Sequence, residues 1–295
     1  MFNLVLTPQP QLFTTNARVG RMNTTALSVS IVIPAFNERD TISACILAAL
    51  NQTVAASEVI VVDNKSTDGT GDIVRALQVA YPDAPLIYFE QNAEQGLVPT
   101  RNFGLDRAQG DIIGRIDADS VLEPTWVAEV QKAFADDTVS AATGPVIYYD
   151  MPLRRLGLKA DDAVRRVMLV LSREYHFVFG SNMALRATAW RDIQPHVCRD
   201  LNDELHEDID ISVHLHERHH RVAYVSDMVA GMSARRIDDS PSDYYYYVNR
   251  FERTYQRHNV RNLGVRAPMW LLIAAYPALK AVRKGQEWRA NVVVE

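Results

Sequence analysis

Apolar residues occur along the first half of the chain in short runs, separated by stretches with helical spacing. The runs are rich in β-branched residues and end at polar or turn-forming positions, which predicts strands. These predicted strands are Ser28–Ile33, Glu58–Val62, Leu86–Phe89 and Asp111–Ile116. Helices are predicted at Asp40–Leu50, about 70–80, Gly96–Ala108 and Pro124–Ala135. Strands that alternate with helices, and whose apolar runs are continuous, indicate an α/β fold with a parallel sheet covered on both faces.

The pattern changes after residue 135. Val139–Tyr149 reads as extended chain and Val222–Val225 as a late strand. Between them, apolar residues at i, i+3, i+4 and i+7 predict an amphipathic helix. These residues are Val164, Val167, Met168 and Leu171. The predicted organisation is a disordered leader over 1–27, an α/β domain over 28–236, and a basic, partly apolar helical extension over 237–295.

Composition excludes several classes of protein. With 47% hydrophobic and 23% charged residues, the 295-residue chain is not mostly disordered. Its net charge of -5 argues against a basic nucleic-acid binder, so no nucleic-acid partner is expected. No stretch reaches the roughly 20 apolar residues that span a bilayer. Cys45 and Cys198 lack the spacing of a disulfide framework or a structural zinc motif, which fits a reducing compartment such as the cytoplasm.

Charge is distributed unevenly. The segment Asn249–Arg289 holds nine Lys or Arg and two Glu, a net charge of +7, which leaves -12 for the rest of the chain. It is either a solvated helical surface or a tail that meets an anionic membrane surface. Its apolar run Trp270–Ile273 fits core packing and also fits an interfacial helix. The second interpretation places the protein peripherally on the cytoplasmic face of a membrane, with a lipid-linked acceptor.

Acidic residues follow the predicted strands. In parallel sheets ligands gather at the carboxyl ends of the strands, where Pro34–Glu38, Asp63 and Asp117–Asp119 fall. Asp117 and Asp119 can jointly hold a hard divalent cation; alternatively, Asp117 caps the turn and Asp119 is solvated. Asp63 can accept from a nucleobase N–H or a ribose hydroxyl, or it can form an Asx turn with the polar residues that follow.

Arg101 lies in the first turns of a predicted helix. A guanidinium and free amide groups at a helix start suit a phosphate or an acidic neighbour. The alternative is a surface arginine paired with Asp106 or Asp111.

Three acids open a later helix: Glu207, Asp208 and Asp210. Asp208 is either a helix cap or a general base, since adjacent acids oppose one another's ionisation. Five histidines lie nearby, and His216 and His220 are spaced to share a helical face; the others are His206, His214 and His219. Without an HExxH motif they are a weak metal signal, and we expect a polar helix surface.

Taken in order, five segments resemble the inverting family 2 glycosyltransferases with the GT-A fold. They resemble the nucleotide-binding opening, the second-strand motif, the Gly-x-x-x-Ala-Arg-Asn helix with its DxD, the acceptor-side segment and the ED motif. The segments are SIVIPAFNE (Ser30–Glu38), VIVVDNKSTDGT (Val59–Thr70), Glu94–Ser120, GSNMALR (Gly180–Arg186) and HEDIDIS (His206–Ser212). The resemblance covers about Val29 to Ser226, and Pro99-Thr100 departs from the usual small residues before the arginine.

The resemblance implies a GT-A fold, in which a Rossmann-like, mostly parallel sheet is flanked by helices. It places the nucleotide of a nucleotide-diphosphate sugar against Pro34, Phe36, Glu38, Asp63 and Arg101. It assigns Asp117 to the ribose or the metal, Asp119 to Mg²⁺ or Mn²⁺, and Asp208 to the proton of the acceptor hydroxyl. UDP is the commonest nucleotide in the family, and GDP or dTDP remain open. The acceptor is a saccharide or a lipid-linked saccharide.

Two departures from the family narrow the prediction. No QxxRW motif follows the base, which disfavours a processive synthase. No late histidine occurs near residues 231–236, and Arg235 and Arg236 are candidates for contact with the diphosphate instead.

Two rival functions remain open at this point. One is a haloacid-dehalogenase-type phosphatase with Asp117 as nucleophile and Asp119 as acid–base, although that motif normally opens its domain. The other is a non-catalytic nucleotide-sugar binding module. The chain lacks the signature of a dinucleotide dehydrogenase, because no GxGxxG follows the first predicted strand.

Overall fold

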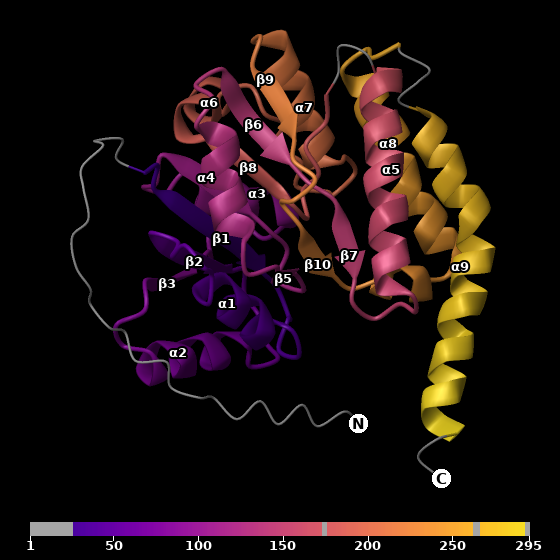
Figure 1. The fold of residues 1–295 in the computed structure, drawn as a ribbon, viewed down its shortest axis with the longest axis horizontal. Coiled ribbons are helices and arrows are strands. Elements are labelled where there is room, and N and C mark those ends of the chain that lie inside the picture. The colour runs from indigo at the N-terminus through magenta and orange to yellow at the C-terminus, as the bar shows by residue number, and fades with distance from the viewer. Residues whose placement is uncertain (1–25, 173–175, 262–265, 293–295) are drawn as a thin grey trace.

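A computed structural model of the chain describes residues 26–172, 176–261 and 266–292, and its central feature is a seven-stranded sheet (Figure 1). All but the last two residues of the expected leader lie outside the described residues. The strand order is β3-β2-β1-β4-β8-β6-β9. The strands are β1 (Val29–Ala35), β2 (Glu58–Asp63), β3 (Leu86–Glu90), β4 (Ile112–Arg115), β6 (Val139–Thr143), β8 (Met183–Arg186) and β9 (Arg221–Tyr224). Strands β1 to β4 pair in parallel, as predicted, and β8 runs antiparallel to both of its neighbours.

Successive residues of each central strand feed two different cores. Ile31 and Ile33 of β1 pack with α1 (Ile42–Leu50), α2 (Thr70–Ala80) and α4 (Trp126–Phe134). Val32 packs on the opposite face with α3 (Leu97–Leu105), α6 (Ala187–Ile193) and α7 (Glu207–Glu217). Burial on both faces explains why the strands are continuous apolar runs rather than alternating ones.

A smaller sheet has the order β5-β10-β7 and lies beside the carboxyl ends of the main strands. It is formed by β5 (Val121–Leu122), β7 (Val146–Tyr148) and β10 (Ala230–Met232). The predicted extended segment 139–149 is therefore split between two sheets. The sequence did not predict β8 and α6, because Gly180–Arg186 was interpreted only through the family resemblance.

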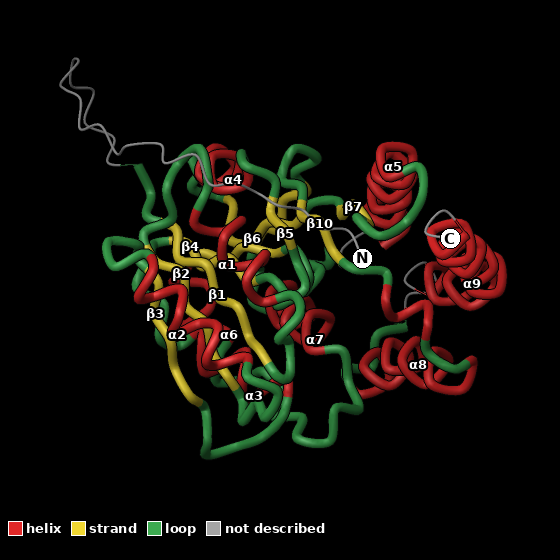
Figure 2. Tube along the Cα trace, turned by 90° about the horizontal axis from the view of Figure 1, so that it is seen from below, coloured by secondary structure: helices red, strands yellow, loops and turns green. Residues whose placement is uncertain are grey.

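Three helices stand together at one side of the main sheet: α5 (Arg154–Ser172), α8 (Pro241–Arg257) and α9 (Ala267–Val292) (Figures 1 and 2). A third hydrophobic cluster joins α7, α8 and α9. The predicted amphipathic helix is part of α5, but its apolar side is largely uncovered, with Val164 40% and Val167 55% exposed. None of the helices in the described part of the chain is long and apolar enough to cross a membrane.

Candidate active site

A pocket at the carboxyl ends of β1 and β4, here called the strand-end pocket, collects all predicted site residues except Asp63 and Asp208. Those residues are Pro34, Phe36, Glu38, Arg101, Asp117 and Asp119. Phe36 is 49% exposed and presents an aromatic ring there. Arg235 and Arg236, from the short 3₁₀ helix Arg235–Asp238, line the same pocket.

The two acids after β4 are not solvated surface groups. Asp119 is only 6% exposed, and burial, followed by the charge of Asp117, raises its pKa to about 6. Its Oδ2 lies 3.1 Å from Nε of Arg235, whose guanidinium also binds the carboxylate of Glu38. The alternative of a solvated Asp119 is therefore wrong. Two neighbouring carboxylates offer the hard oxygen ligands that Mg²⁺ and Mn²⁺ prefer.

Arg101 is buried, in contrast to the predicted surface alternative. Its Nη2 donates to Asp117 Oδ1 at 2.6 Å, and its Nη1 binds the Glu207 carboxylate. The expected surface pair with Asp106 or Asp111 is wrong, since both acids accept from other side chains. Arg101 thus links the acids after β4 to the start of α7.

Arg115, which the sequence analysis missed, is fully buried at the end of β4 and binds Glu207 as well. Its Nε and Nη2 have no hydrogen-bond partner among the described residues. Burial alone would raise the pKa of Glu207. The Arg101 and Arg115 guanidiniums nevertheless hold that pKa well below its usual range. A Cβ on Gly180 would overlap Arg115 Nη2, so the arginine requires glycine at that position. The feature of the sequence that could have revealed Arg115 is the presence of an arginine within a predicted apolar strand.

Asp208 lies in the first turn of α7, whose N-cap position is occupied by His206. It is therefore not the N-cap residue. Its Oδ2 accepts from the Gly180 amide at 3.0 Å, and its Oδ1 from the Ile209 amide at 2.9 Å. Burial, and then the charge of Glu207, raise the pKa of Asp208. A half-buried carboxylate with a raised pKa, held by backbone amides and lining a pocket, is suited to accept a proton.

Asp210 and the histidines near α7 lie differently from what the sequence predicts. Asp210 binds His258 and the Cys198 amide, so of the two neighbouring acids it is Glu207 that opposes ionisation of Asp208. His206 is buried rather than on a polar surface. His220 lies beyond the end of α7 and contacts Asp192, so it shares no helical face with His216.

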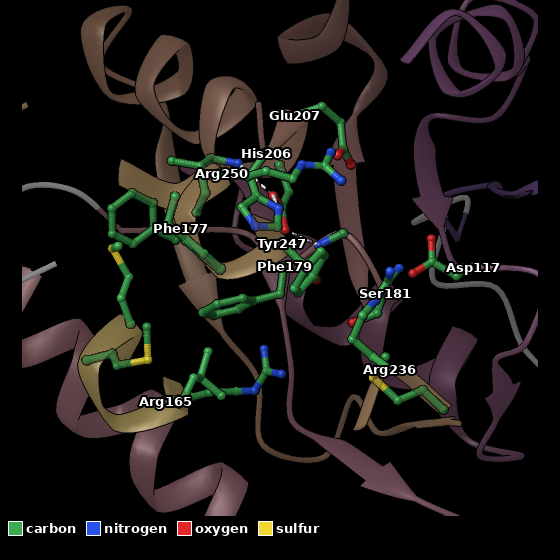
Figure 3. A pocket seen from close by; sticks show the side chains of 18 of the residues that line it. Asp117, Arg165, Phe177, Phe179, Ser181, His206, Glu207, Arg236, Tyr247 and Arg250 are labelled. Atoms are coloured by element: carbon green, nitrogen blue, oxygen red, sulfur yellow. Dashed lines mark hydrogen bonds and ion pairs between the residues drawn. The ribbon is translucent and has the colours of Figure 1, made fainter. Parts of the chain in front are cut away.

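Asp208 lines a second pocket, here called the helical pocket, between α5, α7, α8 and α9. Its walls are mainly apolar and aromatic: Met168, Phe177, Phe179, Tyr247, Phe251, Tyr255, Met269, Leu271 and Leu272. Arg101, Asp117 and Arg236 line both pockets, which therefore adjoin. Figure 3 shows Asp117 and Arg236 on one side of the helical pocket and Phe177 and Arg165 on the opposite side.

Asp63 lies outside both pockets at the end of β2. Its Oδ1 accepts from the Ser66 amide at 2.9 Å and its Oδ2 from the Tyr88 hydroxyl at 2.8 Å. The turn alternative is thus observed, and a nucleobase contact stays a prediction. The next residue, Asn64, lines the strand-end pocket and binds the Gly96 amide through its side chain. This role was missed because the polar loop offered several equivalent turn residues.

Comparison with known proteins agrees with this geometry. The profile of glycosyl transferase family 2 matches residues 30–193, and that of glycosyl transferase family group 2 matches residues 112–283. The chain belongs to glycosyl transferase family 2. The phosphatase alternative is therefore set aside.

Among its relatives, glycosyltransferase AglE of Haloferax volcanii is 35% identical over 108 residues, 36% of this chain and 35% of AglE. The Escherichia coli protein WfaP, a UDP-Glc:alpha-D-GlcNAc-diphosphoundecaprenol beta-1,3-glucosyltransferase, is 35% identical over 112 residues, 36% of this chain and 43% of WfaP. The matched region thus spans less than half of either relative. The mannosyltransferase PcManGT of Pyrobaculum calidifontis, solved with GDP-Man and Mn²⁺, superposes with a TM-score of 0.60 at 20% identity, covering 91% of this chain and 76% of that one. This likeness shows the GT-A fold.

Proposed function

We propose that the chain is an inverting, non-processive glycosyltransferase that moves a sugar from a nucleotide-diphosphate donor to an acceptor hydroxyl. The observation that carries this proposal is the position of Asp208. It is half-buried at the wall of the helical pocket, and that pocket adjoins the one that holds Asp117 and Asp119. A base on one side of the sugar and a site for the leaving diphosphate on the other are what a single displacement needs.

The strand-end pocket is the proposed donor site. Phe36 offers a ring for stacking a nucleobase, and Glu38, Asp117 and Asp119 supply acidic groups near the expected ribose and diphosphate. Asp119 and Asp117 would hold Mg²⁺ or Mn²⁺, which when bound neutralises charge that develops on the leaving diphosphate. PcManGT was solved with a nucleotide-diphosphate sugar and Mn²⁺, which supports this chemistry here. A UDP-sugar is the first donor to test.

Transfer then requires one proton movement. The acceptor oxygen attacks the anomeric carbon while its proton passes to a carboxylate oxygen of Asp208. The bond between that carbon and the diphosphate oxygen breaks, and its electron pair stays with the diphosphate. The Gly180 and Ile209 amides, both bound to Asp208, fix its orientation.

A lipid-linked saccharide at an anionic membrane surface on the cytoplasmic side is the acceptor that the surface favours. Helices α5 and α9 both line the helical pocket, and both carry uncovered apolar side chains: Val167 is 55%, Trp270 67% and Leu271 55% exposed. The name of WfaP includes a diphosphoundecaprenol-linked sugar, which supports an acceptor of this class.

The basic charge of the C-terminal segment contributes less to this surface than the sequence indicated. Arg250 pairs with Asp203, and Arg266 with Glu252, so these charges are already used within the fold. We therefore expect apolar insertion, more than charge, to hold the protein at a membrane.

A thermal-shift screen tests the donor assignment. The full chain is heated with nucleoside diphosphates and their sugars, with and without Mn²⁺, because a ligand of the native state raises apparent stability. We expect one nucleotide class to stabilise the chain in the presence of Mn²⁺, and Asp119→Asn to remove the metal-dependent part. If no nucleotide or nucleotide sugar shifts the transition, the donor assignment is contradicted.

The stereochemistry is tested separately. Proton NMR of the first-formed product should show an anomeric configuration opposite to that of the donor. Retention would overturn the single displacement while leaving the donor site intact.

A further inference from the structure

Three side chains from distant parts of the sequence meet beside the first turns of α7, and none of them lines the strand-end or helical pocket. Cys198 lies in the segment between α6 and α7, Asp210 on α7, and His258 directly after α8. Their sulfur, oxygen and nitrogen atoms lie within 4.8 Å of one another. Asp210 is 1% exposed, whereas Cys198 and His258 are half-buried.

His214 faces the same carboxylate one helical turn later. Its Nε2 lies 3.7 Å from Asp210 Oδ1 and is buried without a hydrogen-bond partner among the described residues. Its Nδ1 lies 3.0 Å from a Glu217 oxygen, so a neutral ring would carry its proton on Nδ1. The lone pair of Nε2 then points at a carboxylate oxygen, an acceptor facing an acceptor. A cation between the two atoms would satisfy both.

We propose that Cys198, Asp210, His214 and His258 form a metal site for Zn²⁺ or a similar borderline cation. One thiolate, two imidazoles and one carboxylate are the donor set of a closed, four-coordinate zinc site. A carboxylate on the second nitrogen of a ligating histidine, as Glu217 provides, is the usual outer support.

Three of the four ligand atoms are already grouped, whereas His214 lies outside that group, so its ring must move toward Cys198 and His258 on binding. Bonds of about 2.0–2.3 Å to zinc place tetrahedral ligand atoms roughly 3.3–3.8 Å apart. The 3.7 Å between His214 and Asp210 already fits, and the 2.7 Å between His258 Nε2 and Asp210 Oδ1 must open by about half an ångström. On binding, the sulfur–metal bond forms as the thiol proton leaves to solvent. The exposed Arg257, which lies beside the thiol, must turn away.

Such a site would clamp the segment between α6 and α7 onto α7 and α8. That segment carries Asp203, which lines both pockets. Asp210 and His214 are one helical turn apart, but Cys198 and His258 come from other segments, which is why spacing gave no sign of the full set. The inference stands apart from the proposed function, because none of these four residues has a role in transfer.

Cobalt binding to the full chain tests the site, since Co²⁺ bound to a thiolate gives a charge-transfer band in the near ultraviolet. After removal of metals with a chelator, Co²⁺ titration should produce this band with one equivalent, and Zn²⁺ should abolish it. Elemental analysis of protein loaded with Zn²⁺ and then desalted should find one zinc per chain.

Matched variants decide which cysteine is involved. Cys45 lies beneath the acids after β4, with its thiol 3.5 Å from the Asp117 carbonyl oxygen, so it is the other thiol near a candidate cation site. We expect Cys198→Ser to lose the band and Cys45→Ser to keep it. A band that instead disappears in Cys45→Ser and persists in Cys198→Ser overturns the proposal, as does absence of any band in the unmutated chain.

Histidine variants guard against a folding artefact. His214→Gln should weaken Co²⁺ binding by at least about tenfold, the loss of one ligand or its support. His219→Gln, at an exposed position just beyond α7, should bind like the unmutated chain. Circular dichroism before metal addition confirms that each variant is folded. Equal affinity in His214→Gln and His219→Gln would contradict the four-ligand site.

Discussion

The strand-end pocket and the helical pocket adjoin at Arg101 and Asp117, and charged side chains line both, but large aromatic and aliphatic side chains are concentrated in the helical pocket. The first gathers carboxylates at the ends of parallel strands, where buried charges meet in defined pairs. The second is walled by aromatic and aliphatic groups from helices that leave apolar side chains in solvent. The proposed donor site therefore lies next to a pocket that combines charged groups with many apolar side chains, and Asp208 belongs to this second pocket.

The two regions differ in how much the local sequence reveals. Candidate residues of the strand-end pocket directly follow predicted strands, so their place in the fold could be predicted from their neighbours in the sequence. The C-terminal half is different: its +7 segment predicts a basic surface, but several of its charges pair internally. Its exposed apolar residues, rather than its net charge, distinguish it.

The largest effect is expected where the two pockets share a charge network. Glu207→Gln removes the carboxylate that binds both Arg101 and Arg115, and Arg115 has no other acidic partner among the described residues. An uncompensated buried charge costs about 3–5 kcal/mol of stability. Urea unfolding should show this loss.

Glu217→Gln is the control for that prediction. It lies at the end of the same helix but its side chain is 54% exposed, so its free energy of unfolding should change by less than about 1 kcal/mol. Equal losses in the two variants would show that the network has no special role.

The metal-dependent part of donor binding should depend on the strand-end pocket alone. Asp119→Ala removes the more buried carboxylate of the pair and should abolish the Mn²⁺-dependent increase in donor affinity, measured by calorimetry. The fold should survive, as circular dichroism would show. Unchanged Mn²⁺-dependent affinity in this variant would remove the metal role from Asp119.

Membrane binding should depend on the exposed apolar side chains of α9. Trp270→Ser together with Leu271→Ser should lower binding to anionic liposomes by about a hundredfold or more, because burial of each large apolar side chain contributes roughly 1.5–3 kcal/mol. Val79→Ser on α2 is the control, since Val79 is 82% exposed but belongs to the donor half. If the unmutated chain does not sediment with liposomes, a soluble acceptor becomes the better proposal.

The smallest effect concerns Arg235. Its guanidinium pairs with Asp119 and Glu38 and thus occupies an oxygen expected to hold the cation. Because Arg235 is half exposed, the pair contributes no more than about 1 kcal/mol, and Arg235→Ala should raise Mn²⁺ affinity by up to about fivefold without donor. A lower affinity would mean that the arginine organises the site instead of competing for it.

Much of the sheet could be predicted because buried parallel strands leave continuous apolar runs. The central strand β8 was missed: its residues Met183–Arg186 are few, and it reaches the sheet between β4 and β6 from a distant segment. The exposed side of α5 was also unexpected, since periodicity shows that a helix has an apolar face but not whether anything covers it.

In the site, residues next to strand ends were predictable, whereas long-range partners were not. Asp119 and Asp117 follow β4 directly, so the sequence placed them correctly. The partners of Arg101 proved to be Asp117 and Glu207, the second more than a hundred positions away, and not Asp106 or Asp111. A short sequence separation favours a pair only when both side chains point to the same space, which the fold decides.

The most direct test of the account is Asp208→Asn, measured for sugar transfer and for donor binding in the same preparation. Asparagine keeps an oxygen for the Gly180 or Ile209 amide but cannot accept the acceptor's proton as the carboxylate does. We predict that transfer falls by about 10²-fold or more, while donor affinity with Mn²⁺ is unchanged. Turnover close to that of the unmutated chain would show that Asp208 only supports the start of α7 and would contradict the proposed mechanism.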